Sequence, residues 1–257
     1  MANGEAGVAI ITGGAGGIGR AIARRLARDG LAIGILDRDA DGGRAVCDEL
    51  RAESPQVGVA AAAADITDDA SVAGAFAQLK EQLGPPTVLV NNAGWDVFET
   101  FRDSSPATWD KVIAINFRGT LACTHAALPD LCAAGNRGRV ISISSDAGRV
   151  GSSGEAVYSG CKAAIIGFSK ALARELSREQ VTVNVVCPGP IDTALLRSVG
   201  ASELGAKVVA GMSRAVPFKR IGQPHEVAEA VAFFASPAAG YVTGQVLSVS
   251  GGLTMAG

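Results

Sequence analysis

Residues 8–19 read VAIITGGAGGIG, an apolar run that leads directly into a glycine-rich turn. The run at 8–12 has the length of a buried strand, and its β-branched residues favour that conformation. The residues after the turn place apolar side chains on one face of a helix, at Ile18, Ala21, Ile22 and Leu26. A strand, a tight turn and a helix in this order predict the first unit of an α/β sheet.

The same alternation continues along the rest of the chain. Strands are expected at 8–12, 31–37, 57–65, 87–92, 139–144, 181–186 and 245–250. Helices are expected through Arg28 and at about 40–53, 68–83, 107–134, 155–178 and 224–235. Apolar strands joined by helical crossovers predict a doubly wound, Rossmann-type α/β fold: a parallel sheet of about seven strands with helices on both faces. We expect one dinucleotide-binding and catalytic domain over residues 1–257.

The composition excludes several classes of protein. With 257 residues, 48% of them hydrophobic and 19% charged, the chain can bury a large core. A net charge of −2 provides no basic surface for nucleic acid. Five scattered cysteines without paired spacing argue against disulfides and a metal site, and no apolar run is long enough to span a membrane. We therefore expect a cytoplasmic protein with no metal, nucleic acid or membrane partner.

The glycine turn has the features of a dinucleotide site. Gly13, Gly17 and Gly19 let the backbone approach a pyrophosphate, whose charge a helix N-terminus favours. Asp37 ends the next expected strand, where its carboxylate would accept hydrogen bonds from ribose hydroxyls and repel a 2′-phosphate. This arrangement favours NAD over NADP. The basic neighbour Arg38 could tolerate a phosphate, and Asp37 could instead be an ordinary turn residue.

Residues 157–164 read VYSGCKAA, which puts Tyr158 and Lys162 four residues apart and therefore on one face of a helix. From the pair alone, a solvated helix face is the ordinary interpretation. An ammonium close to a phenol would stabilise the phenolate and lower a pKa that is normally about 10. The pair therefore also has the chemistry of an acid/base group and the residue that tunes it.

Four motifs occur in a fixed order: TGGAGGIG at 12–19, NNAG at 91–94, the spacing of Ser145, Tyr158 and Lys162, and PGPIDT at 188–193. Together they resemble the short-chain dehydrogenase/reductase family over essentially the whole chain. The resemblance implies that Tyr158 is the general acid/base, that Lys162 assists it and contacts the nicotinamide ribose, and that Ser145 orients the substrate oxygen. It also implies that Asn116 holds a water that relays protons, although Asn116 could otherwise be an exposed polar or capping residue.

The resemblance further assigns residues to NAD. The expected cofactor-binding residues are Gly13, Gly17, Ile18, Gly19, Asp37, Asp65, Ile66, Asn91, Ala93, Gly94, Tyr158, Lys162, Pro188, Gly189, Ile191 and Thr193. Of these, Asp65 and Ile66 resemble the pair that contacts adenine. Ile191 and Thr193 resemble the contacts to the nicotinamide carboxamide.

The substrate side is less regular. Residues 194–217 resemble the variable segment that closes over the substrate, which could equally be a surface helix packed on the core. Stretches at 91–98, 144–158, 187–196 and 244–255 resemble members of the family that oxidise ring alcohols of CoA thioesters. The candidate pocket residues are Ser145, Trp95, Asp96, Asp146, Val150, Ser153, Leu195 and Leu196. Apart from Ser145, ordinary loop packing is the alternative for each of them.

These features predict NAD-dependent oxidation of a secondary alcohol, cyclic or β-hydroxyacyl and possibly a CoA thioester, to the ketone. The resemblance also implies a homotetramer. An NADP-dependent 3-oxoacyl reductase of the fatty-acid type is one alternative, and Asp37 argues against it. A dinucleotide-binding redox sensor without catalysis is another, and the presence of Asn116, Ser145, Tyr158 and Lys162 argues against that.

Overall fold

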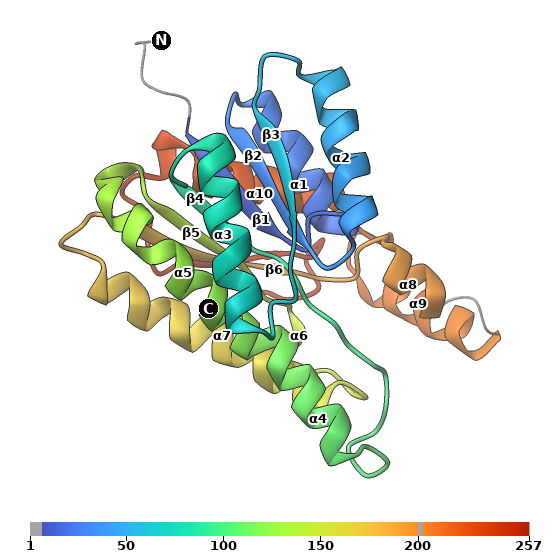
Figure 1. Ribbon diagram of the computed structural model, residues 1–257. Coiled ribbons are helices and arrows are strands. Elements are labelled where there is room, and N and C mark those ends of the chain that lie inside the picture. Colours follow the sequence, from blue (N-terminus) through green and yellow to red (C-terminus); the bar gives the residue numbers. More distant parts are fainter. Residues whose placement is uncertain (1–6, 200–202, 257) are drawn as a thin grey trace.

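Seven parallel strands form one sheet in the computed structural model, which describes residues 7–199 and 203–256 (Figure 1). The strands are β1 (Val8–Thr12), β2 (Ala32–Asp37), β3 (Val59–Ala63), β4 (Val88–Asn91), β5 (Arg139–Ile143), β6 (Thr182–Pro188) and β7 (Val246–Val249). Their order across the sheet is β3-β2-β1-β4-β5-β6-β7, so the direction of winding reverses between β1 and β4. The predicted doubly wound parallel sheet is confirmed.

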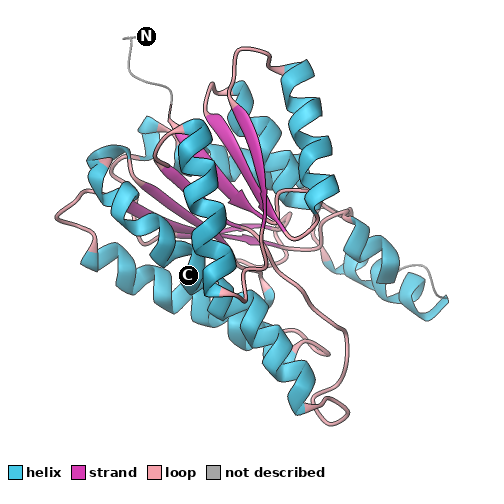
Figure 2. Ribbon diagram, viewed as in Figure 1, coloured by secondary structure: helices cyan, strands magenta, loops and turns pink. Residues whose placement is uncertain are grey.

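Helices connect the strands and cover both faces of the sheet (Figure 2). They are α1 (Gly17–Arg28), α2 (Ala40–Glu53), α3 (Asp69–Leu83), α4 (Pro106–Ile113), α5 (Gly119–Ala133), α6 (Ala147–Val150), α7 (Ala156–Glu175), α8 (Ala194–Val199), α9 (Glu203–Ala215) and α10 (Pro224–Ala235). In the described part of the chain, none of them is both long enough and apolar enough to span a membrane.

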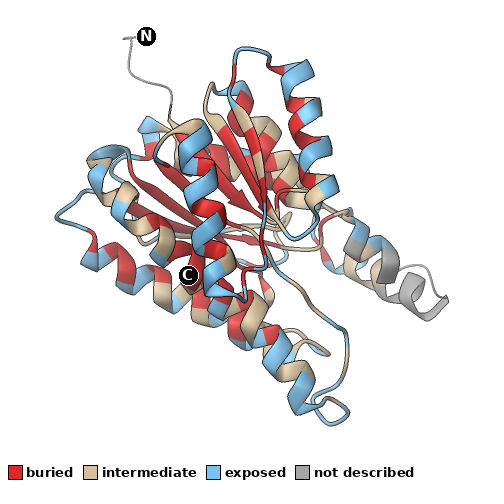
Figure 3. Ribbon diagram, in the orientation of Figure 1, coloured by how far each residue is buried: buried red, intermediate tan, exposed pale blue. Residues whose placement is uncertain are grey.

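Alternating side chains of each strand divide the core into two layers. Ile11 of β1 packs with α1, α2 and α10 on one face, whereas its neighbour Ile10 packs with α3, α5 and α7 on the other. Because successive side chains of a strand point to opposite faces, a sheet covered on both sides needs apolar residues at every position. Figure 3 accordingly shows the strands buried along most of their length.

The long helical stretch expected around 107–134 is present, but it is not a regular α-helix throughout. The chain instead forms α4, a π-helical turn at Ala114–Arg118 and then α5. A π-turn adds a residue to one helical turn and commonly marks a functional position, and here it contains Asn116. The π-turn itself has no distinct signature in a pattern of apolar residues, because it differs from an α-helix in backbone hydrogen bonding.

Other differences lie at element ends. The strand expected at 57–65 is limited to β3, since the carboxylate of Asp65 accepts hydrogen bonds from the backbone N and the hydroxyl of Thr67 and starts a turn. The helix expected to reach 178 ends at Glu175. The expected segment 194–217 contains α8 and α9, which stand apart from the sheet in Figure 1.

Candidate active site

A cavity of about 1370 Å³ opens where the strands end at their carboxyl side. Its lining comes from the residues that follow β1, β2, β3, β4, β5 and β6, together with α7. Ligands of doubly wound sheets bind at this position, outside the point where the strand order reverses. The volume exceeds the roughly 300–1,000 Å³ of ordinary small-molecule sites. The cavity therefore has room for a dinucleotide and a second molecule.

The glycine turn forms one wall of this cavity. Gly13 and Gly17 have φ angles of +64° and +54°, a region that side chains other than glycine rarely adopt. A Cβ on Gly13 would also lie 2.8 Å from the Cα of Ala93. The helix α1 begins directly at the cavity, with no acidic residue in its first turn and no side-chain cap. Its first N–H groups therefore suit a pyrophosphate, and the turn fits a dinucleotide.

Gly19 does not line the cavity, because it packs beneath the turn. A Cβ there would lie 2.2 Å from the carbonyl oxygen of Gly13 and 2.6 Å from Nδ2 of Asn92. This close packing at Gly19 holds the turn in shape, and the expected cofactor contact of Gly19 stays a prediction.

Asn92 holds the turn in place from the neighbouring strand, a specific role that the resemblance of residues 91–94 to a supporting segment does not predict. Its Nδ2 donates to the carbonyl oxygens of Thr12 and Gly13, each at 3.0 Å. Its backbone N and that of Ala93 both donate to Oγ1 of Thr12, also at 3.0 Å. Only its place inside the NNAG motif could have suggested this role. The side chain of Asn91, in contrast, lies away from the cavity and donates to Thr124 at 2.9 Å.

The other end of the cavity carries the residues expected at the adenosine. Asp37 and Arg38 both line it, and the Asp37 carboxylate accepts hydrogen bonds from the backbone N of Ala15 and of Asp39, each at 3.0 Å. Asp65 lines it as well, and the hydrogen bonds from Thr67 lower the pKa of Asp65. Ile66 is buried beside it.

Tyr158 and Lys162 share one face of α7, as their spacing predicts. Nζ of Lys162 lies 5.5 Å from the centroid of the Tyr158 ring and donates to the carbonyl oxygen of Ile143 at 2.9 Å. Lys162 is only 3% exposed, and this burial lowers its pKa to about 8. The ammonium therefore keeps most of its charge at pH 7 and loses it as the pH rises through about 8.

The pKa of Tyr158 moves in the direction opposite to the one expected from Lys162 alone. Burial raises it most, and the acidic side chains of Asp96 and Glu155 raise it further, whereas a hydrogen bond with Ser145 lowers it. Our expectation considered only the ammonium and omitted the two carboxyl groups that the fold brings next to the phenol. In the structure, Tyr158 is therefore a protonated phenol at neutral pH.

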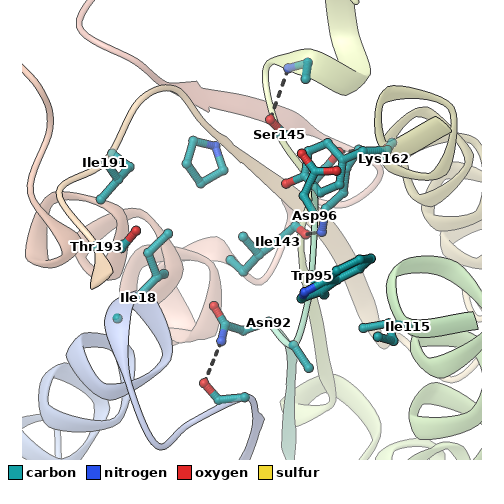
Figure 4. Close-up of a pocket in the computed structure, with 18 of the residues that line it drawn as sticks. Ile18, Asn92, Trp95, Asp96, Ile115, Ile143, Ser145, Lys162, Ile191 and Thr193 are labelled. Atoms are coloured by element: carbon teal, nitrogen blue, oxygen red, sulfur yellow. Dashed lines mark hydrogen bonds between the residues drawn. The ribbon is translucent and has the colours of Figure 1, made fainter. Parts of the chain in front are cut away.

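The two adjacent serines have different environments. Ser144 is buried and donates to the carbonyl oxygen of Lys162 at 2.7 Å, which ties β5 to α7. Ser145 lines the cavity beside Tyr158, and its Oγ accepts a hydrogen bond from the backbone N of Ala147 at 3.1 Å (Figure 4). Of the pair, Ser145 therefore has its hydroxyl at the cavity.

Asn116 is fully buried behind the cavity in the π-turn. Its Nδ2 donates to the carbonyl oxygens of Trp95 at 2.6 Å and of Val112 at 3.0 Å. Its Oδ1 accepts a hydrogen bond from the backbone N of Trp95 at 3.3 Å. A Cβ on Gly94 would meet this oxygen at 3.0 Å and Nζ of Lys162 at 3.5 Å. The amide and the ammonium thus lie close together on the same side of Gly94.

Known proteins resemble this chain along nearly all of its length. The family model described as enoyl-(acyl carrier protein) reductase matches residues 13–254. The chain belongs to the short-chain dehydrogenase/reductase family. The (3R)-3-hydroxyacyl-CoA dehydrogenase of Canis lupus familiaris is 38% identical, with 96% of each chain covered. The 3-oxoacyl-(acyl-carrier-protein) reductase FabG of Escherichia coli (strain K12) is 35% identical, covering 98% of this chain and 99% of that protein.

A solved structure of levodione reductase has the same fold, with a TM-score of 0.91, 30% identity and 96% of each chain covered. Membership makes the protein an oxidoreductase, and members of the family bind a nicotinamide dinucleotide. The cavity of this short-chain dehydrogenase/reductase agrees with that cofactor in size, in its glycine turn and in its helix N-terminus.

On the substrate side, most of the predicted residues reach the cavity. Trp95, Asp96, Val150 and Leu196 line it, as do Pro188, Gly189, Ile191 and Thr193 where the family would hold nicotinamide (Figure 4). Ser153 does not line it. The side chain of Leu195 lies outside the described part of the structure.

Asp146 lines the cavity, but its carboxylate already accepts a hydrogen bond within the protein. Its Oδ1 accepts a hydrogen bond from Oγ of Ser248 at 2.5 Å, and the same hydroxyl accepts one from Arg149 at 2.8 Å. These contacts connect α6 to β7. The placement of Asp146 therefore agrees better with support of the pocket wall than with direct contact to a substrate.

Proposed function

We propose that this short-chain dehydrogenase/reductase uses NAD to oxidise a secondary alcohol, cyclic or β-hydroxyacyl, to the ketone. The observation that supports the proposal most is the placement of Tyr158, Ser145 and Lys162 together in one cavity with room for two molecules. A phenol, a hydroxyl and an ammonium in reach of one substrate oxygen suit proton removal and charge stabilisation at that oxygen.

In the proposed reaction, the Tyr158 oxygen takes the proton of the substrate hydroxyl. NAD, when bound, would accept the hydride that leaves the carbon bearing this hydroxyl. Ser145 holds the substrate oxygen beside the phenol, and the nearby ammonium of Lys162 stabilises the phenolate. Asn116 and Lys162, which lie close together beside Gly94, would return protons to solvent. Because the Tyr158 pKa is raised, we expect oxidation to become faster as the pH rises toward about 8, where Lys162 begins to lose its charge.

The mechanism can be tested with the two tyrosines of the chain. Tyr158→Phe removes the acid/base oxygen and is expected to lower kcat about 100-fold or more, while NAD affinity stays nearly unchanged. Tyr241 is fully exposed, so Tyr241→Phe is the matched control and should retain full activity. Turnover by Tyr158→Phe at the wild-type rate would contradict the mechanism.

The preference for NAD rests on Asp37. Its carboxylate lines the cavity and would face the 2′-phosphate of NADP as a like charge, which costs several kcal/mol. We expect kcat/KM with NAD to exceed that with NADP about 100-fold, and Asp37→Asn to reduce this ratio at least about 10-fold. Asn keeps the size of the side chain and one acceptor oxygen, so the change removes the charge and one of the two hydrogen bonds from the backbone N of Ala15 and of Asp39.

For the substrate, we propose a β-hydroxyacyl or 2-hydroxycycloalkyl group carried as a CoA thioester. Stretches such as NNAGWDVF at 91–98 are similar to 2-hydroxycyclohexanecarboxyl-CoA dehydrogenase, and the canine relative is named for hydroxyacyl-CoA. Lys111 also lines the cavity, 3.9 Å over the ring of Trp95, where it can meet an anionic phosphate. Residues 194–217 would close over this substrate, since Leu196 and Met212 already face the cavity.

A panel of alcohols assayed with NAD tests the substrate class. It should contain hydroxyacyl-CoA thioesters, cyclic alcohols and simple secondary alcohols, and we expect the thioesters to have the highest kcat/KM. A protein that binds NAD but oxidises none of them would favour a redox sensor without catalysis. A higher kcat/KM for simple alcohols than for every thioester would contradict the thioester proposal alone.

A second candidate is an NADP-dependent 3-oxoacyl reductase. Arg38 favours it, because it is exposed and lines the cavity next to Asp37, where it could pair with a phosphate. The similarity to FabG is consistent with the same reaction class. Higher kcat/KM with NADPH and a 3-oxoacyl thioester than with NADH would favour this candidate over the first.

We also propose that the protein is a homotetramer in the cytoplasm. The free edge strand β7 and its surroundings expose Leu247, Tyr241 and Met255, whose apolar surface a partner copy could cover. All five cysteines are free, as is usual in a reducing compartment. Light scattering should give about four times the 25.9 kDa chain mass, and a monomer would contradict the assembly.

A further inference from the structure

Two carboxyl groups meet at the edge of the active-site cavity. Asp96 follows the NNAG motif, and Glu155 directly precedes α7. The backbone N of Glu99 donates to the carbonyl oxygen of Gly154 at 3.0 Å, so the two loops are joined. Asp96 and Glu155 both line the cavity together with Tyr158, and both carboxyl groups are close enough to the phenol to raise its pKa. The loops therefore present a carboxyl pair to the position where the proposed reaction takes place.

Two carboxyl groups that share a partly buried site cannot both be charged without a large cost, so the pKa of one of them rises. Burial and the neighbouring Glu155 raise the pKa of Asp96 to about 8. Its Oδ2 is buried without a hydrogen-bond partner among the described residues. The other charged or titratable groups that act on Asp96 or are affected by it are Tyr158, Cys161 and Lys162 of α7. At neutral pH the Asp96–Glu155 pair thus carries one proton and one negative charge.

The positive charge of Lys162 is not available to balance a further anion in the pocket. Its Nζ is held by the carbonyl oxygen of Ile143 and lies near the Tyr158 ring. In the proposed reaction this ammonium already offsets the charge that develops on the Tyr158 and substrate oxygens. A carboxylate on the substrate would be an additional negative charge near the pair in a partly buried site, where charges interact more strongly than in water.

We propose that the Asp96–Glu155 pair is a specificity determinant that excludes substrates with a free carboxylate near the reacting carbon. The acid group of a β-hydroxy or 2-hydroxycycloalkyl acid must then arrive as a neutral thioester, ester or amide. This inference rests on the proposed alcohol oxidation and specifies its substrate class. Phosphates of a long thioester are not affected, because they can lie at the cavity mouth near Lys111.

The test compares two compounds that differ mainly in this charge: 3-hydroxybutyrate and its methyl ester, each assayed with saturating NAD. In the wild type we expect kcat/KM for the ester to exceed that for the acid about 100-fold. The double variant Asp96→Asn, Glu155→Gln keeps the shape and hydrogen-bonding capacity of the pair without its charge. The double variant should lower the ester-to-acid ratio of kcat/KM about 10- to 100-fold, because kcat/KM for the acid rises.

Glu99→Gln is the matched control, because Glu99 is on the same loop but does not line the main cavity. It should leave the ratio of ester to acid unchanged. An ester-to-acid ratio in the double variant within twofold of the wild-type ratio would overturn the inference. The inference would also be overturned if the ester-to-acid ratio of kcat/KM fell in the double variant only because the ester reacted more slowly.

Binding of the ketones separates this inference from the proposed function. Calorimetry with methyl acetoacetate and acetoacetate, in the presence of NADH, needs no turnover. The wild type should bind the ester more tightly, and the double variant should lose this difference. Equal wild-type affinity for both compounds would overturn the role of the pair, whereas failure of the wild type to oxidise any alcohol would overturn only the proposed function.

Discussion

Replacing Gly148 even by alanine is expected to lower stability and activity, because Gly148 is in α6 and lies directly against the backbone of α7 at Lys162. A Cβ at Gly148 would lie 2.6 Å from the carbonyl carbon of Lys162, 2.7 Å from its Cβ and 2.8 Å from the backbone N of Ala163. Carbon atoms in ordinary contact are about 3.5–4.0 Å apart. Since two of the three neighbours are backbone atoms, no side chain can swing away, and α6 or α7 must shift.

The magnitude follows from this overlap. Inserting a methyl group into a packed region costs about 1–3 kcal/mol, and each kcal/mol lowers the Tm of a protein of about 150–250 residues by about 2–4 °C. Gly148→Ala is therefore expected to lower Tm by about 2–12 °C. The shift also moves the Lys162 backbone, whose oxygen accepts the Ser144 hydrogen bond at 2.7 Å, so we expect kcat to fall about 10-fold or more.

Scanning calorimetry and steady-state kinetics measure both effects. Gly74→Ala is the matched control, because Gly74 is inside α3 and no described atom lies within 4 Å of the position that its new methyl carbon would take. Alanine favours a helix over glycine by about 0.5–1 kcal/mol, so this control should raise Tm slightly and leave kcat unchanged. A Gly148→Ala protein with wild-type Tm and kcat would refute the packing of α6 against α7.

Three further outcomes are expected. Asn92→Ala removes both side-chain hydrogen bonds to the glycine turn, and calorimetry should show a loss of about 1–3 kcal/mol of stability together with weaker NAD binding. Glu226 pairs with Arg220 and accepts a hydrogen bond from the backbone N of Gln223, and these contacts lower the pKa of Glu226 to about 2. Glu226→Gln should therefore lose about 1 kcal/mol of folding stability at pH 7, and this loss should disappear as the pH falls from about 4.5 toward 2. Iodoacetamide should modify Cys132 first in the native protein, since the other four cysteines are buried, and mass spectrometry that found another cysteine labelled faster would contradict this.

Local patterns predicted many elements well. The strand at 8–12 and the helices at 40–53 and 224–235 have the expected bounds. These elements have strong local signals, such as Asp39, whose side chain accepts a hydrogen bond from the backbone N of Gly42 at the start of α2. The helical stretch expected around 107–134 is present, but the π-turn inside it was missed, because such a turn changes backbone hydrogen bonding without changing which residue types are apolar.

For the site, motif spacing was enough to bring Tyr158 and Lys162 to one helix face, since four residues make about one turn. It was not enough to set the pKa of Tyr158. That value depends most on burial and then on Asp96, which is 62 positions away along the chain and approaches the phenol only when two loops meet. Long-range charge proximity has no signature in a local pattern.

The sequence by itself determined the doubly wound sheet, the position of the dinucleotide turn and the set of groups available for acid/base chemistry, because these depend on periodicity and on spacing within single elements. Only the tertiary structure decided that Asn92 holds the turn, that the Ser144 hydroxyl ties β5 to α7, and that Asp96 lies near Glu155. Each of these depends on the distance between segments far apart in the chain, and that distance is set by packing of the whole fold.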